Sequence, residues 1–339
     1  MPEPSPTPAR RGRLLRFGAA VAVLFALAGY LAVQYLTGGA GVPRCRVVSG
    51  KGGDASYEFT PEQAVNAATI SAVGTSRGLP ERAVAIALAT SLQESGLRNI
   101  RHGDRDSLGL FQQRPSQGWG TTQQIMDPTY AAGVFYEHLA KVPDYTRLPL
   151  TVAAQRVQRS GYPQAYAKHE PDATLLAAAL TGRAAATLTC EGRPGATPVG
   201  GPDSVRAALV RDFGHEVLQE AGADVSAQGD SAAPDGTPSS AASRSPSGSA
   251  TAGSPAAAVA ARTVTVPVRA GAASGTGVRG WELAHWAVAN SSALHIERVS
   301  YAGREWTAGR REGEWARSGT QGAPAARESA TEVRIVTAQ

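Results

Sequence analysis

The chain has 339 residues, of which 42% are hydrophobic and 18% charged, and this length and mixture indicate more than one small domain. Its net charge is +5, but residues 1–16 alone contribute +3, through four arginines against one glutamate. Only +2 remains for the rest of the chain, so the sequence predicts no basic groove and excludes nucleic acid as an expected partner.

Residues 17–36 form an uncharged stretch in which Gln34 is the one strongly polar side chain. Its 20 residues match the roughly 20 that a helix needs to cross a bilayer, so the stretch predicts a transmembrane anchor. Because the arginines precede it, we expect a single-pass plasma-membrane protein with residues 1–16 in the cytoplasm and the rest outside. A cleaved secretory signal, with Gly38–Gly41 as the cleavage region, is the alternative and also places the working part outside.

Cys45 and Cys190 are the two cysteines of the chain, and they flank the part with the strongest helical patterns. In an oxidising compartment this placement predicts one disulfide that closes residues 45–190 at their two ends. A metal site is not expected, because the sequence has no Cys-x-x-Cys and no further ligand type beside either cysteine.

Helical patterns dominate residues 57–190, after a Gly-rich spacer. Thr60, Pro61 and Gln63 have the arrangement of a helix start, and Gly96 follows an apolar stretch typical of a buried central helix. No window alternates with period two, so residues 45–190 are predicted to form a mainly α domain. The expected helices are Thr60–Gly78, Glu81–Ser95, two that start at Asp127 and Thr151, and Ala173–Leu188.

The rest of the chain is expected to form an extension, a linker and a small domain. Residues 191–225 contain a predicted amphipathic helix at 204–221. Of the 37 residues from 226 to 262, 31 are Ala, Ser, Gly, Pro or Thr, which predicts a disordered linker. Residues 263–339 are a predicted α+β domain of about 75 residues, a size that folds alone only marginally. Its expected elements are strands at 263–268, 296–306 and 332–337 and a helix at 281–294.

Glu94 lies in the last turn of the predicted central helix. Burial and the unpaired carbonyls of the helix end both disfavour a charged carboxylate there, so we expect its pKa to be raised. A carboxylic acid that is protonated near neutral pH suits general acid catalysis at a glycosidic oxygen. Taken alone, a Glu near a helix end is more often a solvated surface residue.

Two motifs accompany Glu94. Glu94-Ser95 is followed by Gly109–Gly120, which reads GLFQQRPSQGWG, and then by Val157–Tyr166, which reads VQRSGYPQAY. In this order and spacing they resemble the lysozyme-like domain of soluble lytic transglycosylases and goose-type lysozymes, in its secreted, phage-tail-like subgroup. The resemblance implies a mainly α lysozyme-like fold that acts on peptidoglycan glycan strands without a metal or organic cofactor.

The resemblance also implies roles for four residues. Glu94 would be the catalytic acid and then the base, and Ser95 would hold or orient it. Gly109 would leave space for the sugar backbone, and Gln112 would hydrogen-bond the glycan. Without the flanking match, a loop glycine with positive φ and a polar loop residue are the simpler interpretations of Gly109 and Gln112.

Aromatic side chains are the expected stacking surfaces for sugar rings. Trp119 and Tyr162 lie beside glycines in predicted loops, and we rank them above Tyr130 and Tyr136, because aromatic residues at helical spacing are more often core. Many transglycosylases carry an Ala-Tyr-Asn motif late in the domain, and the corresponding stretch at 158–162 lacks that Asn.

A second carboxylate would distinguish hydrolysis from transglycosylation. Asp104 and Asp106 are the acidic residues between Glu94 and Gln112, and the role we expect for either of them is to cap the turn before Gly109. Hydrolases of either stereochemistry use two carboxyl groups. The resemblance to lytic transglycosylases implies one Glu, assisted by the substrate's acetamido group and the muramyl 6-hydroxyl, and this favours a transglycosylase over a lysozyme.

The stretches 280–290 and 296–306 resemble the second half of a secreted domain related to zinc D-Ala-D-Ala peptidases. The closing strand has Glu332-Val333-Arg334 in place of the His-x-His pair of that family. His285 and His295 would lie about 15 Å apart along a helix axis, too far to share one metal. We therefore expect no zinc and no peptidase activity, and a wall-contacting or partner-binding role for residues 263–339.

The sequence as a whole predicts a membrane-anchored enzyme that cleaves the β-1,4 bond between N-acetylmuramic acid and N-acetylglucosamine in peptidoglycan. One alternative is a non-catalytic wall-binding or scaffold protein with a degenerate lysozyme-like fold. Another is a subunit or sensor of a membrane complex. The sequence identifies no particular protein partner.

Overall fold

The computed structural model describes residues 24, 28–29, 43–50, 53–160, 162, 164–191, 200–219, 255–268, 275–309, 314–317 and 330–338. The predicted cytoplasmic segment, almost all of the predicted anchor and most of the predicted linker lie outside these residues. None of the helices in the described ranges is both long and apolar enough to cross a membrane. The chain divides into two units, Met1–Pro43 and Arg44–Gln339, and all elements named below belong to the second.

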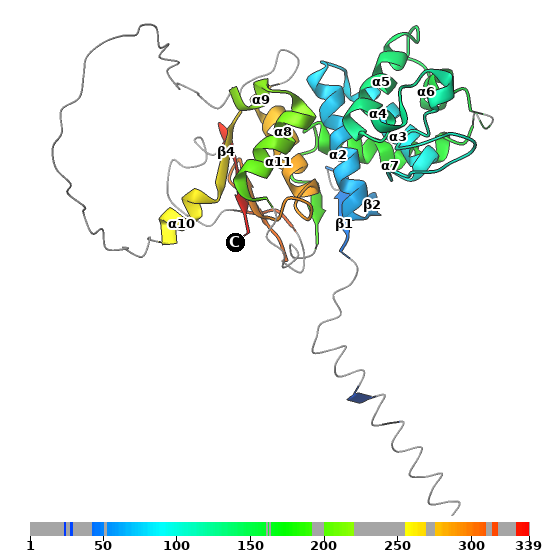
Figure 1. Cartoon of the computed structure of the whole chain (residues 1–339). Coiled ribbons are helices and arrows are strands. Elements are labelled where there is room, and N and C mark those ends of the chain that lie inside the picture. Colours follow the sequence, from blue (N-terminus) through cyan, green and yellow to red (C-terminus); the bar gives the residue numbers. More distant parts are fainter. Residues whose placement is uncertain are drawn as a thin grey trace, which may run out of the picture. The chain divides into compact units, whose positions relative to one another are not determined.

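Helices and two antiparallel sheets make this unit mixed α+β (Figure 1). We call residues 43–191 the helical region and residues 255–338 the C-terminal region. The helical region contains α2 (Pro61–Ser76), α3 (Glu81–Ser95), α4 (Thr122–Ile125), α5 (Pro128–Ala140), α6 (Leu150–Gln158) and α7 (Glu170–Leu180), with the short 3₁₀ helices η1 (Pro115–Gln117) and η2 (Ala167–His169).

Local signals set the ends of α2 and α3. The Thr60 hydroxyl accepts a hydrogen bond from the Gln63 N–H at 3.3 Å, and the Gln63 side chain accepts from the Thr60 N–H at 2.7 Å, so the predicted capping box is confirmed. Helix α3 ends at Gly96, whose φ of 63° is left-handed. Helix α3 is buried along most of its length and packs against α2, α5, α6 and α7, which confirms the prediction of a central helix.

A three-stranded sheet, which the sequence did not predict, closes the helical region. Strands β1 (Cys45–Val48), β2 (Ser56–Phe59) and β3 (Leu188–Cys190) pair in the antiparallel order β2-β1-β3. Each is too short to show alternation, and the helix expected to reach Leu188 ends at Leu180 instead. Cys45 lies opposite Cys190 in the register, and the predicted disulfide between them is present.

Helices α8 (Gly201–Phe213) and α9 (Glu216–Gln219) follow the helical region. They replace the single amphipathic helix expected at 204–221, because Gly214 interrupts it. The apolar side chains expected on its inner face, from Val205 to Val217, are buried. Helix α10 (Pro255–Ala261) lies inside the range expected to be a linker.

The C-terminal region is a five-stranded antiparallel sheet with one long helix, α11 (Thr276–Ala289). The strand order is β4-β8-β5-β6-β7, so β8, the last strand along the chain, lies between β4 and β5 and pairs with both. The strands predicted at 263–268, 296–306 and 332–337 are confirmed, the second as a hairpin. The strands are β4 (Thr263–Pro267), β5 (Ile296–Tyr301), β6 (Arg304–Thr307), β7 (Ala316–Arg317) and β8 (Glu332–Thr337).

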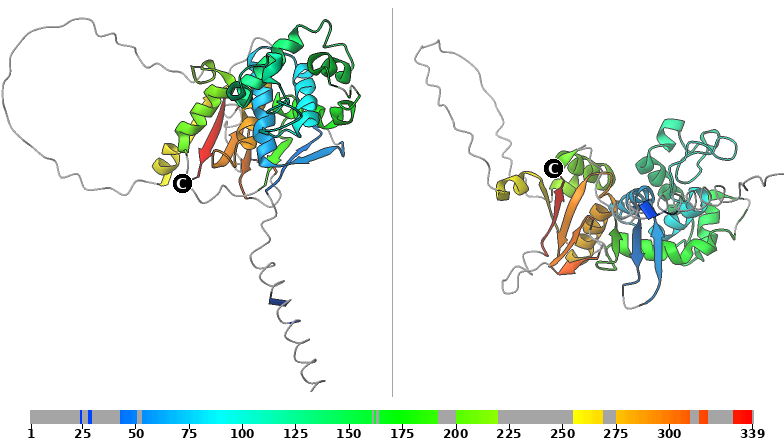
Figure 2. Two further views of the ribbon diagram at one scale, coloured as in Figure 1. Left: turned by 45° about the vertical axis from the view of Figure 1, so that its right-hand side comes forward. Right: turned by 90° about the horizontal axis from the view of Figure 1, so that it is seen from below.

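Helix α11 packs against β5 and β8 on one side and against α2, α7 and β3 of the helical region on the other (Figure 2). All its residues from Gly280 onward are buried. Asp212 of α8 accepts hydrogen bonds from Thr69 of α2 at 3.2 Å and from the Trp286 indole of α11 at 2.8 Å. The C-terminal region therefore packs into the same compact unit, where the sequence had predicted a tethered, separate domain.

Candidate active site around Glu94

Glu94 projects from the last turn of α3, as predicted, and is half-buried. The Tyr166 hydroxyl donates a hydrogen bond to its Oε1 at 2.7 Å. Burial raises the pKa of Glu94 above its usual value, and the hydrogen bonds from Tyr166 and Gln158 oppose the rise. The carboxyl is therefore held in one position by a neutral donor and takes up a proton more easily than an exposed Glu.

Tyr166 is the functional residue that sequence reasoning missed. Its ring is fully buried, and it directly precedes η2. Burial raises the pKa of its hydroxyl, and the nearby Glu94 charge raises it further, so Tyr166 stays a neutral donor. The available signal was its position as the last residue of the second motif, Val157–Tyr166.

Gln158, at the end of α6, joins the two sequence motifs around Glu94. Its side-chain amide donates to the Phe111 carbonyl at 2.7 Å and also lowers the pKa of Glu94. The loop of the first motif and the second motif therefore meet at the end of α3.

Ser95 acts on the loop and not on the carboxylate. Its buried hydroxyl lies 2.8 Å from the Leu110 carbonyl, which also accepts from the Ser91 hydroxyl at 3.1 Å. The Ser95 oxygen also accepts from the Arg98 N–H at 3.2 Å. Ser95 therefore fastens the end of α3, on which Glu94 lies, to the first motif.

Gly109 is a loop glycine with positive φ and Gln112 is a polar loop residue, which are the simpler interpretations of the two positions. Gly109 is buried with a φ of 74°, and a Cβ at this position would lie 2.7 Å from the Ile125 carbonyl, so the backbone conformation and the contact with Ile125 both require glycine. Gln112 is half-buried with a φ of 48°, and its amide donates to the Gly109 carbonyl at 3.2 Å. Both residues shape the loop that carries Phe111.

The two aromatic candidates differ in exposure. Trp119 is 9% exposed and stacks on His138 with ring centroids 4.2 Å apart, so the expected sugar-stacking role of Trp119 is wrong. Tyr162 is 78% exposed and free to stack on a sugar. Tyr136, ranked lower as a core residue, is buried and donates to the Ile70 carbonyl at 2.9 Å.

Asp106 is a structural residue. Its carboxylate accepts from the Ser116 N–H at 2.9 Å and pairs with Arg114 at 2.7 Å. The Ser116 N–H first, and then Arg114, hold the pKa of Asp106 well below its usual range. Asp106 therefore fastens the turn at η1, which follows Gly109, and does not form the expected cap of the turn before Gly109; Asp104 is exposed. No group of three or more His, Cys, Asp or Glu in the described part of the chain is arranged to hold a metal ion.

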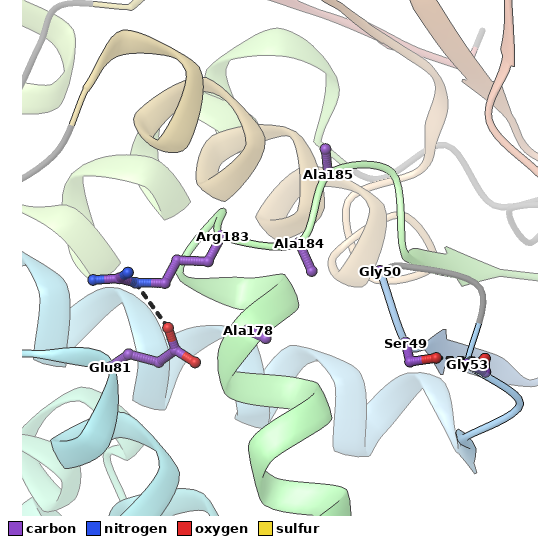
Figure 3. A pocket seen from close by; sticks show the side chains of 8 residues that line it. All are labelled: Ser49, Gly50, Gly53, Glu81, Ala178, Arg183, Ala184 and Ala185. Atoms are coloured by element: carbon purple, nitrogen blue, oxygen red, sulfur yellow. Dashed lines mark hydrogen bonds and ion pairs between the residues drawn. The ribbon is translucent and has the colours of Figure 1, made fainter.

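A pocket of about 580 Å³ lies at the other end of α3 (Figure 3). Glu81 begins α3 and pairs with Arg183 at 2.8 Å, and both side chains line this pocket; the remaining lining comes from small residues of the β1–β2 turn, of α7 and of the α7–β3 loop. At 1.5 Å of rise per residue, Glu81 and Glu94 are separated by about 20 Å along the helix axis. The pocket is therefore not part of the Glu94 site.

No protein-family model matches the chain, and no match is found among the curated proteins. The functional interpretation consequently depends on the geometry around Glu94 and on the two motifs.

Proposed function

We propose that this protein cleaves the β-1,4 bond between N-acetylmuramic acid and N-acetylglucosamine in peptidoglycan, as a lytic transglycosylase or muramidase. The observation that carries the proposal is the Glu94 carboxyl, half-buried at the end of α3, with a raised pKa and a neutral donor, Tyr166, at 2.7 Å. These are the properties that a general acid needs for a sugar leaving group.

In the proposed reaction, protonated Glu94 gives its proton to the glycosidic oxygen as the bond to the muramyl C1 breaks. The resulting carboxylate then takes a proton from the group that attacks C1. That group is the 6-hydroxyl of the same muramyl sugar in a transglycosylase, or water in a muramidase. Tyr166 donates to the carboxylate after the first proton transfer, so the same hydrogen bond holds Glu94 ready to act as the base.

The positions of the neighbouring acids favour the transglycosylase. A hydrolase needs a second carboxyl group as nucleophile or base. Asp106 is occupied by Arg114 and the Ser116 N–H, and it fastens the turn at η1. A reaction in which the substrate supplies its own nucleophile requires Glu94 alone.

We further propose that the enzyme is anchored in the plasma membrane by residues 17–36, with the helical region outside. The disulfide between Cys45 and Cys190 supports an oxidising compartment. Peptidoglycan glycan strands would then be the partner of the Glu94 site, and the membrane the partner of the anchor. Glu94 and the substrate supply the chemistry of the proposed reaction, which uses no metal or organic cofactor.

A non-catalytic wall-binding protein is the second candidate. It is favoured by one observation, the stretch from Gln158 to Tyr162, which lacks the Asn of the transglycosylase motif. Incubation of the protein with purified peptidoglycan separates the two. The enzyme releases soluble muropeptides and loses this activity in Glu94→Gln, whereas the binding protein sediments with the wall and releases nothing in either form.

A further inference from the structure

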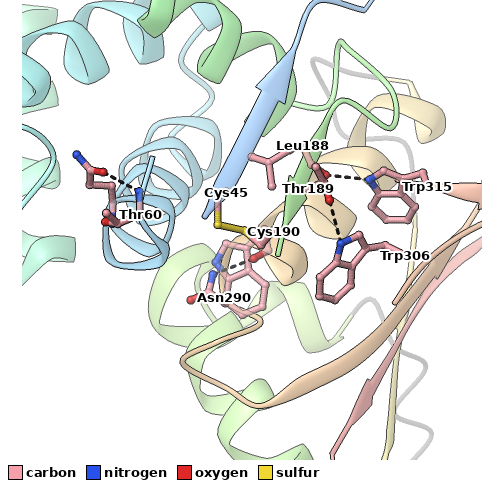
Figure 4. The surroundings of a disulfide bond; sticks show 10 residues. Cys45, Thr60, Leu188, Thr189, Cys190, Asn290, Trp306 and Trp315 are labelled. Carbon is pink, nitrogen blue, oxygen red and sulfur yellow. Dashed lines mark hydrogen bonds between the residues drawn. A yellow bond between two sulfur atoms is a disulfide. The ribbon is translucent and has the colours of Figure 1, made fainter. Parts of the chain in front are cut away.

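The C-terminal region is fastened to a short strip of the helical region beside the disulfide (Figure 4). Three side chains of the C-terminal region, one imidazole and two indoles, reach successive residues of this strip. The three bonds join the Thr187 N–H to His285 Nε2 (3.2 Å), the Trp315 indole N–H to the Leu188 carbonyl (2.9 Å) and the Trp306 indole N–H to the Thr189 hydroxyl (3.2 Å). Cys190 comes next and is bonded to Cys45, so the C-terminal region docks on a strand that is covalently held.

His285 is the titratable member of this contact, and both of its ring nitrogens are used. Its Nδ1 lies 2.7 Å from the carbonyl of Ala179, near the end of α7, and its Nε2 lies 3.2 Å from the Thr187 nitrogen. A carbonyl only accepts, so Nδ1 must carry the proton; a backbone N–H only donates, so Nε2 must be bare. The geometry fits one tautomer of the neutral imidazole.

A second proton on this ring has no place in the docked arrangement. A proton on Nε2 would point at the Thr187 N–H, which is itself a donor. It would also leave a positive charge on a fully buried side chain. Burial lowers the pKa of His285 to about 4, and the Ala179 carbonyl partly opposes this. The nearest aromatic rings are those of Trp281 and Trp315, with centroids 5.4 and 5.9 Å from the imidazole.

Most of the charged side chains on the elements packed around His285 have partners of their own. On α11, Glu282 pairs with Arg279 at 2.9 Å; after α7, Arg183 pairs with Glu81 at 2.8 Å; on β6, Arg304 donates to the Trp315 carbonyl at 3.4 Å; and on α8, Asp212 binds Trp286 at 2.8 Å. On β5, Glu297 pairs with Arg262 and Arg298 with Glu305 of β6 at 3.9 Å. On β8, Arg334 pairs with Glu332, and Arg317 on β7 is exposed. The hydrogen-bond partners of the imidazole are two backbone groups, so no carboxylate bonded to it would compensate a histidinium.

We propose that His285 is a protonation-sensitive latch that holds the C-terminal region on the helical region when neutral and releases it when protonated. Release leaves Glu94 in place, because Ala179 lies about 14 Å along α7 from Glu170, the end of the helix near Tyr166. The C-terminal region is then a releasable partner of its own chain, and this inference does not depend on the proposed enzyme activity.

The direction of the pH dependence follows from linkage. The folded, docked pKa is depressed, so the stabilisation from docking is complete above the ordinary histidine pKa and is lost as the pH falls through the docked value. The pKa of His285 falls from 6.5 to about 4 on docking. The equilibrium constant for docking is therefore about 30-fold smaller at pH 5 than at neutral pH, and at most about 300-fold smaller at lower pH.

Tryptophan fluorescence of the full chain in detergent measures docking directly, because four of its five tryptophans lie in the C-terminal region. We expect the emission to shift to the red between about pH 6.5 and 4 while far-UV circular dichroism is unchanged. His215→Gln, at an exposed histidine between α8 and α9, should keep this transition as the matched control. His285→Gln should show no such shift in tryptophan emission, because glutamine does not titrate. This holds whether the C-terminal region of the variant is docked or undocked at neutral pH.

NMR of the ¹⁵N-histidine-labelled wild type keeps the test independent of how the variant folds. The latch predicts that His285 is protonated only at Nδ1 at neutral pH and titrates at the same midpoint as the tryptophan transition. The proposal is overturned if His285→Gln shows the wild-type transition. It is also overturned if the wild type shows no transition down to pH 4, or if His285 titrates without any change in tryptophan emission.

Discussion

Removal of a single oxygen atom, in Tyr166→Phe, tests how Glu94 is held. The buried ring stays in place, and the variant loses the hydroxyl that donates to Glu94 Oε1 at 2.7 Å. Because this hydrogen bond favours the charged carboxylate, its loss raises the pKa of Glu94 further. The general acid then stays protonated to higher pH, so the alkaline limb of the pH–activity profile moves upward.

The same variant should lose stability in a pH-dependent way. A hydrogen bond to a charged group contributes about 1.5–3 kcal/mol, and the half-buried position of Glu94 favours the lower end of that range. We therefore expect about 1.5 kcal/mol of destabilisation at pH 7 and less at acidic pH, where Glu94 is neutral in both proteins.

Clearing of a peptidoglycan suspension across a series of pH values measures the first effect, and urea unfolding at neutral and acidic pH measures the second. Tyr136→Phe is the matched control, because it also removes a buried tyrosine hydroxyl, the one bonded to the Ile70 carbonyl at 2.9 Å. The control should lose stability without any change in the shape of its pH profile. An alkaline limb of Tyr166→Phe that stays fixed or moves to lower pH would show that Tyr166 does not stabilise the Glu94 carboxylate.

Three further variants test other parts of the account. Cys45→Ala with Cys190→Ala should lower the free energy of unfolding by up to about 4–5 kcal/mol, the chain-entropy value for so long a loop, and unchanged urea unfolding would contradict this. Asp212→Ala leaves one donor from α2 and one from α11 without an acceptor, so calorimetry should show that the free energy of unfolding falls by about 2–4 kcal/mol. A smaller fall would mean that other groups fasten α11. Tyr162→Ala should weaken glycan binding at an unchanged melting temperature, since its side chain is 78% exposed, and unaltered binding would remove Tyr162 from the site.

Local signals explain why the helices of the central fold could be predicted. The capping box at Thr60, the Asp127 cap and the glycine at position 96 act within a few residues, and α2, α5 and α3 begin or end where these signals lie. The strands of the first sheet depend on partners far along the chain, as Cys45 pairs opposite Cys190. Four residues of sequence carry too little periodicity to indicate such a strand.

The same distinction applies to the candidate site. Glu94 could be predicted because its position at a helix end is a local property. Which side chain contacts its carboxylate depends on the packing of α3 against η2, so Tyr166 was missed. Trp119 was misjudged because a glycine neighbour does not reveal that His138 covers the ring.

The docking of the C-terminal region could not be predicted for a similar reason. The sequence 281–294 reads as a helix, and that expectation does not say which other elements cover it. In the structure α11 is buried from Gly280 onward, and the polar atoms of Trp286 and His285 find partners on α8, on α7 and at Thr187, the residue before β3. Such long-range pairs leave no periodic signal.

Mass analysis of the muropeptides released from purified peptidoglycan by the full chain and by Glu94→Gln tests the central claim most directly. The account predicts that the wild type releases products that end in an anhydromuramyl sugar, lighter by one water than the products of hydrolysis. It also predicts that folded Glu94→Gln releases them at least about 10²–10⁴-fold more slowly, because the amide has no proton to give. Release at the wild-type rate by Glu94→Gln, or no release by the wild type, would contradict the account.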